Sequence, residues 1–170
     1  MYSNVDFGSA ALTNSWRYNI GGGPGSYRHP SDIYDRIWEP HTYDNFVKMA
    51  NESWVDWKTD DDTYGIPVEV LMTAGRSDNA STNLTVSWKP SGETWYIYFH
   101  LAEIQVLKTG QVREIGIYVM DQMVETVLPE YGKSKTVSSI PMSCPFEMNF
   151  TLSASPQSSL PPILNPYVHT

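Results

Sequence analysis

The fold is decided by the stretch Thr94-Trp95-Tyr96-Ile97-Tyr98-Phe99-His100-Leu101-Ala102-Glu103-Ile104. Successive side chains of an extended chain point to opposite faces. One face of this stretch therefore carries Trp95, Ile97, Phe99 and Leu101, and the other carries Tyr96, Tyr98 and His100. A helix is the alternative for any long apolar run, but adjacent aromatic residues crowd a helix and fit a pleated surface. The pattern predicts a strand that is covered on both sides.

Other segments of the chain also alternate between apolar and polar residues, which is the pattern of strands. They are residues 68–72, 84–88, 115–119 and 146–153, with a shorter candidate at 16–20. Many short strands without repeated helices are typical of an antiparallel sandwich. We expect an all-β fold, an antiparallel two-sheet β-sandwich with one short surface helix. The best helix candidate runs from Tyr43 to Ala50, with Thr42 or Asp44 as its cap.

Composition excludes several classes of protein. The 170 residues are 41% apolar and 18% charged, with a formal net charge of −8. This length favours a single domain with a sizeable core. The acidic balance disfavours nucleic-acid binding, and the chain has neither a polybasic membrane patch nor an apolar run of about 18 residues. We therefore expect no nucleic-acid partner and no membrane insertion by this chain.

The sequence offers no convincing metal or cofactor site. Cys144 is the only cysteine, and we expect it to be a small buried apolar residue. The acidic run Asp60-Asp61-Asp62 lacks the spaced ligands of a calcium loop, so we interpret it as a solvated turn. The glycine-rich run at 21–25 lacks the Gly-Lys-Ser/Thr ending of a phosphate loop. We predict no metal and no cofactor.

Four segments match the N-glycosylation acceptor pattern, and they begin at Asn51, Asn79, Asn83 and Asn149. One match is close to chance, whereas four indicate passage through the secretory pathway. In the segments starting at Asn83 and Asn149, the period of two places the Asn and the Thr on the polar face, so both Asn side chains should face solvent. The first residues lack the basic and apolar regions of a signal peptide. We expect a secreted ectodomain whose signal peptide is missing from this sequence.

Residues 27–40 alternate between charged and aromatic side chains, ending in Asp35-Arg36-Ile37-Trp38-Glu39-Pro40. A structural role, as an irregular segment pinned to the sandwich, and a binding role are both open. In the structural interpretation Asp35 and Arg36 find buried partners, while Tyr34, Ile37 and Trp38 pack. In the binding interpretation exposed Tyr and Trp offer a large contact area at low entropy cost. Our candidate ligand-binding residues are Tyr27, Tyr34, Trp38, Tyr43 and Tyr64.

The chain resembles the second half of the malectin-like region of plant leucine-rich-repeat receptor-like kinases. The matching segments are residues 16–21, 27–32, 34–38, 66–68, 73–74, 98–104, 113–115 and 159–165. The most specific of them are Tyr34-Asp35-Arg36-Ile37-Trp38 and His100-Leu101-Ala102-Glu103-Ile104. The resemblance implies a malectin-like β-sandwich of the jelly-roll type on the extracellular side of the plasma membrane. It also implies a non-catalytic recognition module whose ligand is a cell-wall carbohydrate or a peptide or protein.

The resemblance carries over to the sugar site of animal malectin only at some positions. Tyr34 matches a tyrosine that contacts sugar, whereas Gln105 and Val106 stand where malectin has an aromatic pair. The kinase motifs of the parent receptors are absent from the sequence. The partners that the resemblance implies are the ligand, a receptor partner or a second copy of the chain.

The end of the chain departs from the family pattern. Pro166-Tyr167-Val168-His169-Thr170 follows Asn165, and Pro166 cannot donate a hydrogen bond to a central ladder. We predict that the closing strand is truncated, either short or absent, and leaves a sheet edge uncovered. We divide the chain into an N-terminal strand and Gly-rich turn at 1–26 and a malectin-like sandwich at 27–170.

Two alternative functions remain open beside recognition. A glycoside hydrolase needs two carboxylates about 5 to 9.5 Å apart, and no pattern pairs the available carboxylates Glu39, Asp56, Asp60 and Glu103. We expect Glu103 to be a buried structural carboxylate and His100 to be a core histidine. A scaffold that spaces or dimerises a receptor is the other alternative, and sequence does not separate it from recognition.

Overall fold

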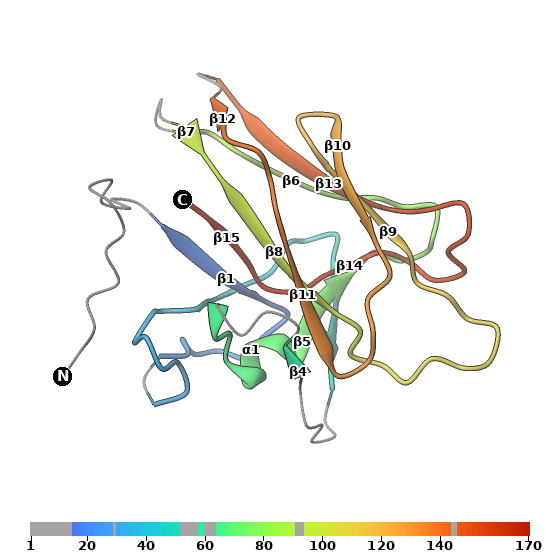
Figure 1. The fold of residues 1–170 in the computed structure, drawn as a ribbon, viewed down its shortest axis with the longest axis horizontal. Helices are drawn as coiled ribbons and strands as arrows, with labels where there is room; N and C mark the ends of the chain where they lie inside the picture. The colour runs from blue at the N-terminus through green and yellow to red at the C-terminus, as the bar shows by residue number, and fades with distance from the viewer. Residues whose placement is uncertain (1–14, 29, 52–57, 60–63, 91–93, 144–145) are drawn as a thin grey trace.

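A computed structural model describes residues 15–28, 30–51, 58–59, 64–90, 94–143 and 146–170. The described residues form four sheets and one short helix (Figure 1). The largest sheet has the order β2 (Glu39–His41), β1 (Trp16–Ile20), β15 (Tyr167–His169), β8 (Ile97–Ala102), β11 (Lys133–Ser138) and β4 (Lys58–Thr59). The second sheet has the order β10 (Gln122–Val127), β9 (Ile115–Val119), β13 (Met148–Ala154) and β6 (Leu84–Trp88).

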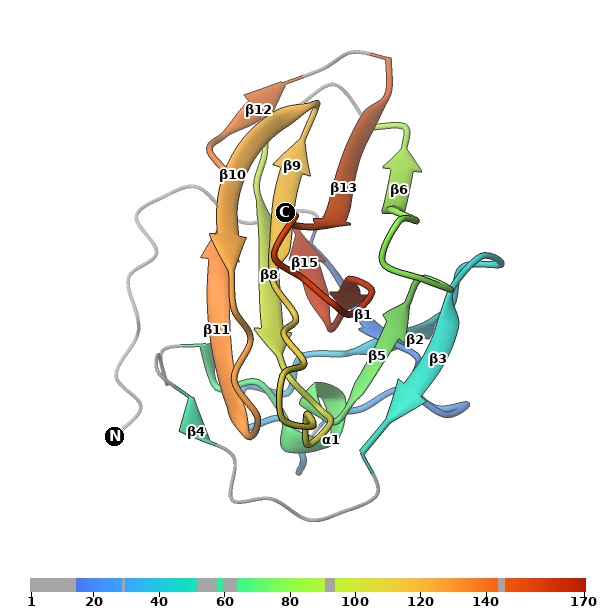
Figure 2. The same ribbon diagram turned by 90° about the vertical axis from the view of Figure 1, so that its right-hand side faces the viewer.

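Two smaller sheets complete the fold. β12 (Met142–Ser143) pairs with β7 (Thr94–Trp95), and β5 (Thr73–Arg76) lies between β14 (Ile163–Leu164) and β3 (Val47–Ala50). Figure 2 shows β3 and β5 below β6, on the side of the molecule that also holds the helix α1 (Val68–Leu71). The expected β-rich fold with one short helix is confirmed, although the strands are distributed over more sheets than the two that we expected.

The central strand lies where its sequence predicts. β8 pairs antiparallel with β15 on one side and with β11 on the other. Its inward side chains Ile97, Phe99 and Leu101 join the main core, and the Phe99 ring meets Phe150 of β13 edge-on, with 5.0 Å between ring centroids. The six-stranded and four-stranded sheets therefore share one apolar core.

A second apolar cluster covers the other side of the central strand. It consists of Trp38, Ile66, Val70, Leu71 and Val168, with Tyr27, Tyr64 and Tyr98 packed against it. Tyr98 belongs to β8, and Val70 and Leu71 belong to α1. This cluster explains why both faces of β8 are apolar, and it places the segment around Trp38 against the six-stranded sheet.

The helix prediction was wrong. Residues 47–50 form the strand β3, which pairs antiparallel with β5 from Val47↔Arg76 to Ala50↔Thr73. The helix instead lies at Val68–Leu71, where alternation predicted a strand. Pro67 stands at its N-cap position, and Val70 and Leu71 are buried against Trp38. Tertiary pairing and packing outweigh weak local propensity in segments this short.

The prediction of an uncovered edge at the C-terminus was also wrong. β15 is short, as expected, but it lies inside the six-stranded sheet between β1 and β8. Pro166 precedes the strand, and its carbonyl accepts a hydrogen bond from the His100 amide. Pro166 has no amide hydrogen, but it lies outside β15, so the ladder loses no hydrogen bond and the closing strand forms. Cys144 and the acidic run at 60–62 lie outside the described residues.

Candidate functional site

The buried carboxylate of Asp32 organises the loop from Pro30 to Trp38, which we call the Asp32 loop. The Asp32 side chain accepts hydrogen bonds from the Tyr34 amide at 2.8 Å, the Trp38 indole at 2.7 Å and Arg36 Nε at 2.8 Å. Burial alone would raise the pKa of the Asp32 carboxyl, but the hydrogen bonds from Arg36 and Trp38 outweigh burial and lower that pKa. Asp32 is therefore an ionised anchor.

Arg36 ties the Asp32 loop to a neighbouring segment. Its two terminal nitrogens donate to the carbonyls of Tyr64 at 2.7 Å and Gly65 at 2.6 Å. The guanidinium also lies 4.9 Å from the centroid of the Tyr34 ring. Charge-assisted bonds in this number hold the loop in one conformation. The expectation that Arg36 finds a buried partner is confirmed by Asp32, whereas Asp35 pairs with Arg28 at the surface.

The structure separates the aromatic candidates on this loop by exposure. Our candidate site required an exposed Trp38. Trp38 is 0% exposed, so it is a core residue and offers no surface to a ligand. Tyr34 is 55% exposed, Ile33 71% and Ile37 45%. The expectation that Tyr34 and Ile37 pack was therefore wrong. The sequence did not suggest Ile33 as a binding residue, because a single Ile in an irregular segment is normally expected in the core.

Tyr27 and Tyr64 support the Asp32 loop from beneath. Tyr27 exchanges two backbone hydrogen bonds with Trp38, at 3.1 and 2.9 Å. The half-buried Tyr64 ring lies between the loop and the sheet, 5.8 Å from the Tyr98 ring and 5.5 Å from the His100 ring. The structure thus brings together Tyr27, Tyr34, Trp38 and Tyr64, of which Tyr34 alone is exposed.

Tyr43 lies apart from this group. Its hydroxyl is 2.6 Å from the hydroxyl of Tyr167, and its ring packs on His41 and Phe46. Burial raises the pKa of Tyr43 to about 12. Tyr43 is partly buried against the main core and its hydroxyl has an internal partner, which disfavours it as a surface for stacking.

Two of the acid–base candidates from the sequence, Glu103 and His100, are structural in the folded chain, whereas Glu39 is exposed and Asp56 and Asp60 lie outside the described residues. Glu103 Oε2 accepts a hydrogen bond from Arg113 Nε at 2.7 Å, and each side chain is 1% exposed. His100 is buried, bonds to the Thr136 hydroxyl at 2.9 Å, and has its pKa lowered by burial to about 3. Both sequence predictions, a structural Glu103 and a core His100, are confirmed.

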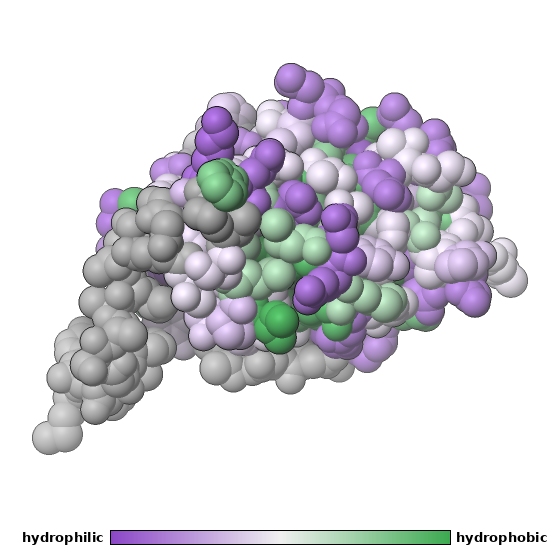
Figure 3. Space-filling model, turned by 90° about the horizontal axis from the view of Figure 1, so that it is seen from above, coloured by the Kyte–Doolittle hydropathy of each residue, from purple (hydrophilic) through white to green (hydrophobic). Residues whose placement is uncertain are grey.

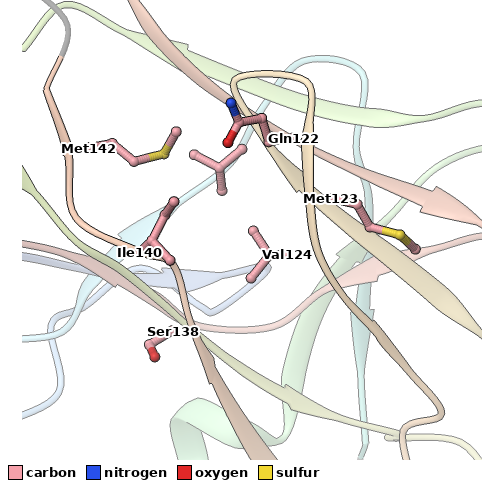
Figure 4. A pocket seen from close by; sticks show the side chains of 7 residues that line it. Gln122, Met123, Val124, Ser138, Ile140 and Met142 are labelled. Carbon is pink, nitrogen blue, oxygen red and sulfur yellow. The ribbon is translucent and has the colours of Figure 1, made fainter.

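A pocket of about 180 Å³ lies near the outer edge of the four-stranded sheet (Figure 4). Its lining residues are uncharged: Val119, Gln122, Met123, Val124, Ser138, Ile140 and Met142. Figure 4 shows the Met123 side chain pointing away from the other labelled residues. Ligand pockets usually measure about 300 to 1,000 Å³. This pocket is therefore too small for an oligosaccharide, and it lacks carboxylates for catalysis.

The surface of the described residues mixes polar and apolar side chains. Figure 3 shows one face, on which hydrophilic residues predominate and green residues gather near the middle. Exposed apolar side chains are not confined to the Asp32 loop, since Val106, Ile140 and Phe146 are 76%, 63% and 81% exposed. Among the described residues, no helix is long and apolar enough to cross a membrane, and no group of three or more His, Cys, Asp or Glu side chains could hold a metal ion.

Comparison with known proteins relates this geometry to a family. The sequence profile of the Malectin-like domain matches residues 1–167. The chain is 35% identical over 149 residues to the probable LRR receptor-like serine/threonine-protein kinase PAM74 of Arabidopsis thaliana. This match covers 83% of the chain but 16% of PAM74, so the chain spans about a sixth of that relative.

Solved structures show the same fold at lower sequence identity. The crystal structure of the plant peptide RALF23 in complex with FER and LLG2 superposes with a TM-score of 0.73 and 20% identity, over 91% of this chain and 47% of that chain. The ANXUR1 extracellular domain from Arabidopsis thaliana gives a TM-score of 0.72 and 18% identity, over 91% of this chain and 47% of that chain. The chain belongs to the Malectin-like domain family, found in the ectodomains of plant LRR receptor-like kinases.

Proposed function

We propose that the chain is a non-catalytic extracellular recognition module that binds a peptide or protein through the exposed side of the Asp32 loop. The six-stranded and four-stranded sheets would be the two layers of a malectin-type sandwich that carries this loop. Membership in a family of receptor ectodomains supports the proposal. So does the fold shared with FER, which has been crystallised with RALF23 and LLG2.

The observation that carries the proposal is the combination of exposed apolar side chains with a rigid base. Ile33, Tyr34 and Ile37 are all exposed, while the loop beneath them is fixed by the hydrogen bonds of Asp32 and Arg36. A preorganised loop loses little conformational entropy on binding. Apolar and aromatic anchors that become buried at the centre of an interface supply most of its affinity.

Carbohydrate binding is the second candidate, and the exposure of Tyr34 favours it. Tyr34 is 55% exposed, and the resemblance matches it to a sugar-contacting tyrosine. Sugar sites use aromatic platforms together with polar groups, yet Trp38 is buried and the position of Val106 is aliphatic. Ile33 and Ile37 supply aliphatic surface without hydrogen-bonding groups, which suits a protein partner better.

A hydrolase that uses Glu103 is disfavoured by the state of this carboxylate. Glu103 is paired with Arg113 in the interior, where neither substrate nor water reaches it. A general acid must lie within hydrogen-bonding reach of the bond that is cleaved. We therefore propose no catalytic role for Glu103.

The experiment is a binding measurement with matched variants. The purified chain is immobilised and exposed to RALF23 peptide with and without LLG2, and in parallel to an array of cell-wall oligosaccharides. The variant Ile37→Ser tests the loop, and Ile140→Ser is its control, because both isoleucines are exposed. Ile140 lies two residues before β12, at the opposite end of the molecule from residues 27–38 (Figures 1 and 2).

We expect peptide binding that Ile37→Ser weakens at least tenfold and Ile140→Ser leaves unchanged. Oligosaccharide binding that is lost in Tyr34→Ala would replace the peptide proposal by the carbohydrate one. A chain that binds no probe but forms dimers through the loop would favour the scaffold. Equal losses in Ile37→Ser and Ile140→Ser would contradict a role for the loop.

A further inference from the structure

Two N-glycosylation sequons meet on neighbouring strands of the four-stranded sheet. β6 pairs antiparallel with β13, and the register places Thr85 opposite Thr151 and Ser87 opposite Asn149. Thr85 and Thr151 are the third residues of the sequons that begin at Asn83 and Asn149. Their hydroxyl oxygens lie 3.0 Å apart. The fold thus joins two sequons that are far apart in the sequence.

Both sequons turn their acceptor side chains outward. The middle residues, Leu84 and Phe150, are fully buried in the main core. Because side chains alternate along a strand, Asn149 and the two Thr residues lie on the opposite face, and Asn83 directly precedes β6. Asn83 is exposed and Asn149 is partly exposed, which agrees with the sequence expectation. Ser87 lies opposite Asn149 and four residue steps after Asn83, so the two acceptors are about 13 Å apart along the strands.

The outward positions within the three strands around these sequons are uncharged, and the exposed Glu147 and Lys89 flank them. These positions on the three neighbouring strands β6, β13 and β9 are Thr85, Ser87, Asn149, Thr151, Ser153, Gly116 and Tyr118. Hydroxyl and amide groups can exchange hydrogen bonds with sugar hydroxyls without the desolvation cost of a charge.

The other two sequons differ in what their Asn side chains contact. Asn79 lies in the exposed turn before β6, and its Oδ1 accepts hydrogen bonds from the Ser81 amide at 2.9 Å and the Thr82 hydroxyl at 3.2 Å. The Asn51 amide nitrogen instead donates to the Tyr131 hydroxyl at 3.2 Å. A glycan on Asn51 would be attached to the nitrogen that makes this contact, so Asn51 is a less favourable acceptor.

We propose that the outer face of β6 and β13 is a glycan-bearing face, with N-linked oligosaccharides on Asn83 and Asn149. This inference rests on the extracellular location in the proposed function and adds a modified surface to it. In the transfer, the Asn amide nitrogen bonds to the anomeric carbon of an oligosaccharide carried on a polyprenyl diphosphate. The bond from that carbon to the diphosphate oxygen breaks, the diphosphate leaves with the electron pair, and the amide nitrogen loses one proton to a base of the transferase.

The test expresses the chain behind a heterologous secretion signal in plant cells, so that entry into the secretory pathway does not depend on the native targeting. Glycopeptides of the secreted protein are mapped by mass spectrometry before and after enzymatic removal of N-glycans. We expect glycans on Asn83 and Asn149. The variant Asn83→Gln/Asn149→Gln should lose both glycopeptides, and Asn45→Gln, an exposed Asn outside any sequon, should lose none.

A second pair of variants tests the third position of each sequon. Thr85→Val/Thr151→Val should lose both glycans, whereas Thr85→Ser/Thr151→Ser should keep them, because Ser also completes a sequon. Secreted, folded protein with unmodified Asn83 and Asn149 would overturn the inference, even if RALF23 binding were found. Glycans at both sites without any binding of RALF23 would support it and count against the proposed ligand instead.

Discussion

At the residue scale, a single carboxylate decides which side chains of the Asp32 loop are buried and which are exposed. Asp32 draws the Trp38 indole inward and fixes the Tyr34 amide, which leaves the Tyr34 ring at the surface. From the sequence, Tyr34 and Trp38 were both candidates for ligand binding, but the sequence did not show which of the two is buried. That difference depends on a hydrogen bond across six residues and on the carbonyls of Tyr64 and Gly65, far along the chain.

Asp32→Asn should destabilise the fold much more than Asp35→Asn. Removing the charge leaves Arg36 without its buried partner, and breaking such a pair costs about 3 kcal/mol. The ion pair of Asp35 with Arg28 is exposed, so its loss should change stability little. Urea unfolding of the two variants and the parent chain measures the difference. Equal stabilities of the two variants would contradict the role of Asp32 as an anchor.

At the element scale, strands with strong alternation were predicted well and short segments were not. The strands β6, β8, β9 and β13 lie where periodicity places them, because each buries one apolar face or both. A helix was predicted where the strand β3 lies, and a strand was predicted where the helix α1 lies. The pairing of Met49 with Ala74 and the packing of Leu71 depend on residues that are distant in the sequence. The central position of β15 was not predicted, because three residues carry too little periodicity to show with which strands they pair.

Val168→Pro should disrupt the centre of the six-stranded sheet. Val168 lies opposite Arg17 on one side and Tyr98 on the other, and proline removes the amide hydrogen that a central strand needs. Val168→Ala is the control that removes the side chain alone, at about 1 to 3 kcal/mol. Denaturant unfolding should show a clearly larger loss for proline. Matching stabilities of the two variants would place β15 outside the sheet.

At the scale of the whole molecule, buried histidines link stability to pH. His100 has its pKa lowered to about 3 and His169 to about 4, in both cases first by burial. The Asp32 carboxyl, whose pKa is also lowered, adds stability that is lost in acid below its ordinary value near 3.8. All three groups therefore act in the same direction, and acid weakens the fold.

Stability should fall as the pH drops below about 6.5, because the unfolded chain then binds protons that the folded chain excludes. Each histidine contributes up to about 1.4 kcal/mol per pH unit until its folded pKa is reached. His169→Phe should flatten the profile without loss at pH 7, because the ring lies among Trp16, Trp88 and Trp95 and its nitrogens have no hydrogen-bond partner among the described residues. Urea unfolding between pH 7 and pH 4.5 measures the slope, and a profile unchanged in the variant would rule out His169 as a contributor.

The pairing of β1 with β15 has a consequence for any longer polypeptide that contains this module. Trp16 lies opposite His169, so the chain enters and leaves the sheet at neighbouring points of the same end. A force that pulls Trp16 and His169 apart would therefore load the β1–β15 ladder directly and break its hydrogen bonds one after another. This strand pair would be the mechanical weak point of the module.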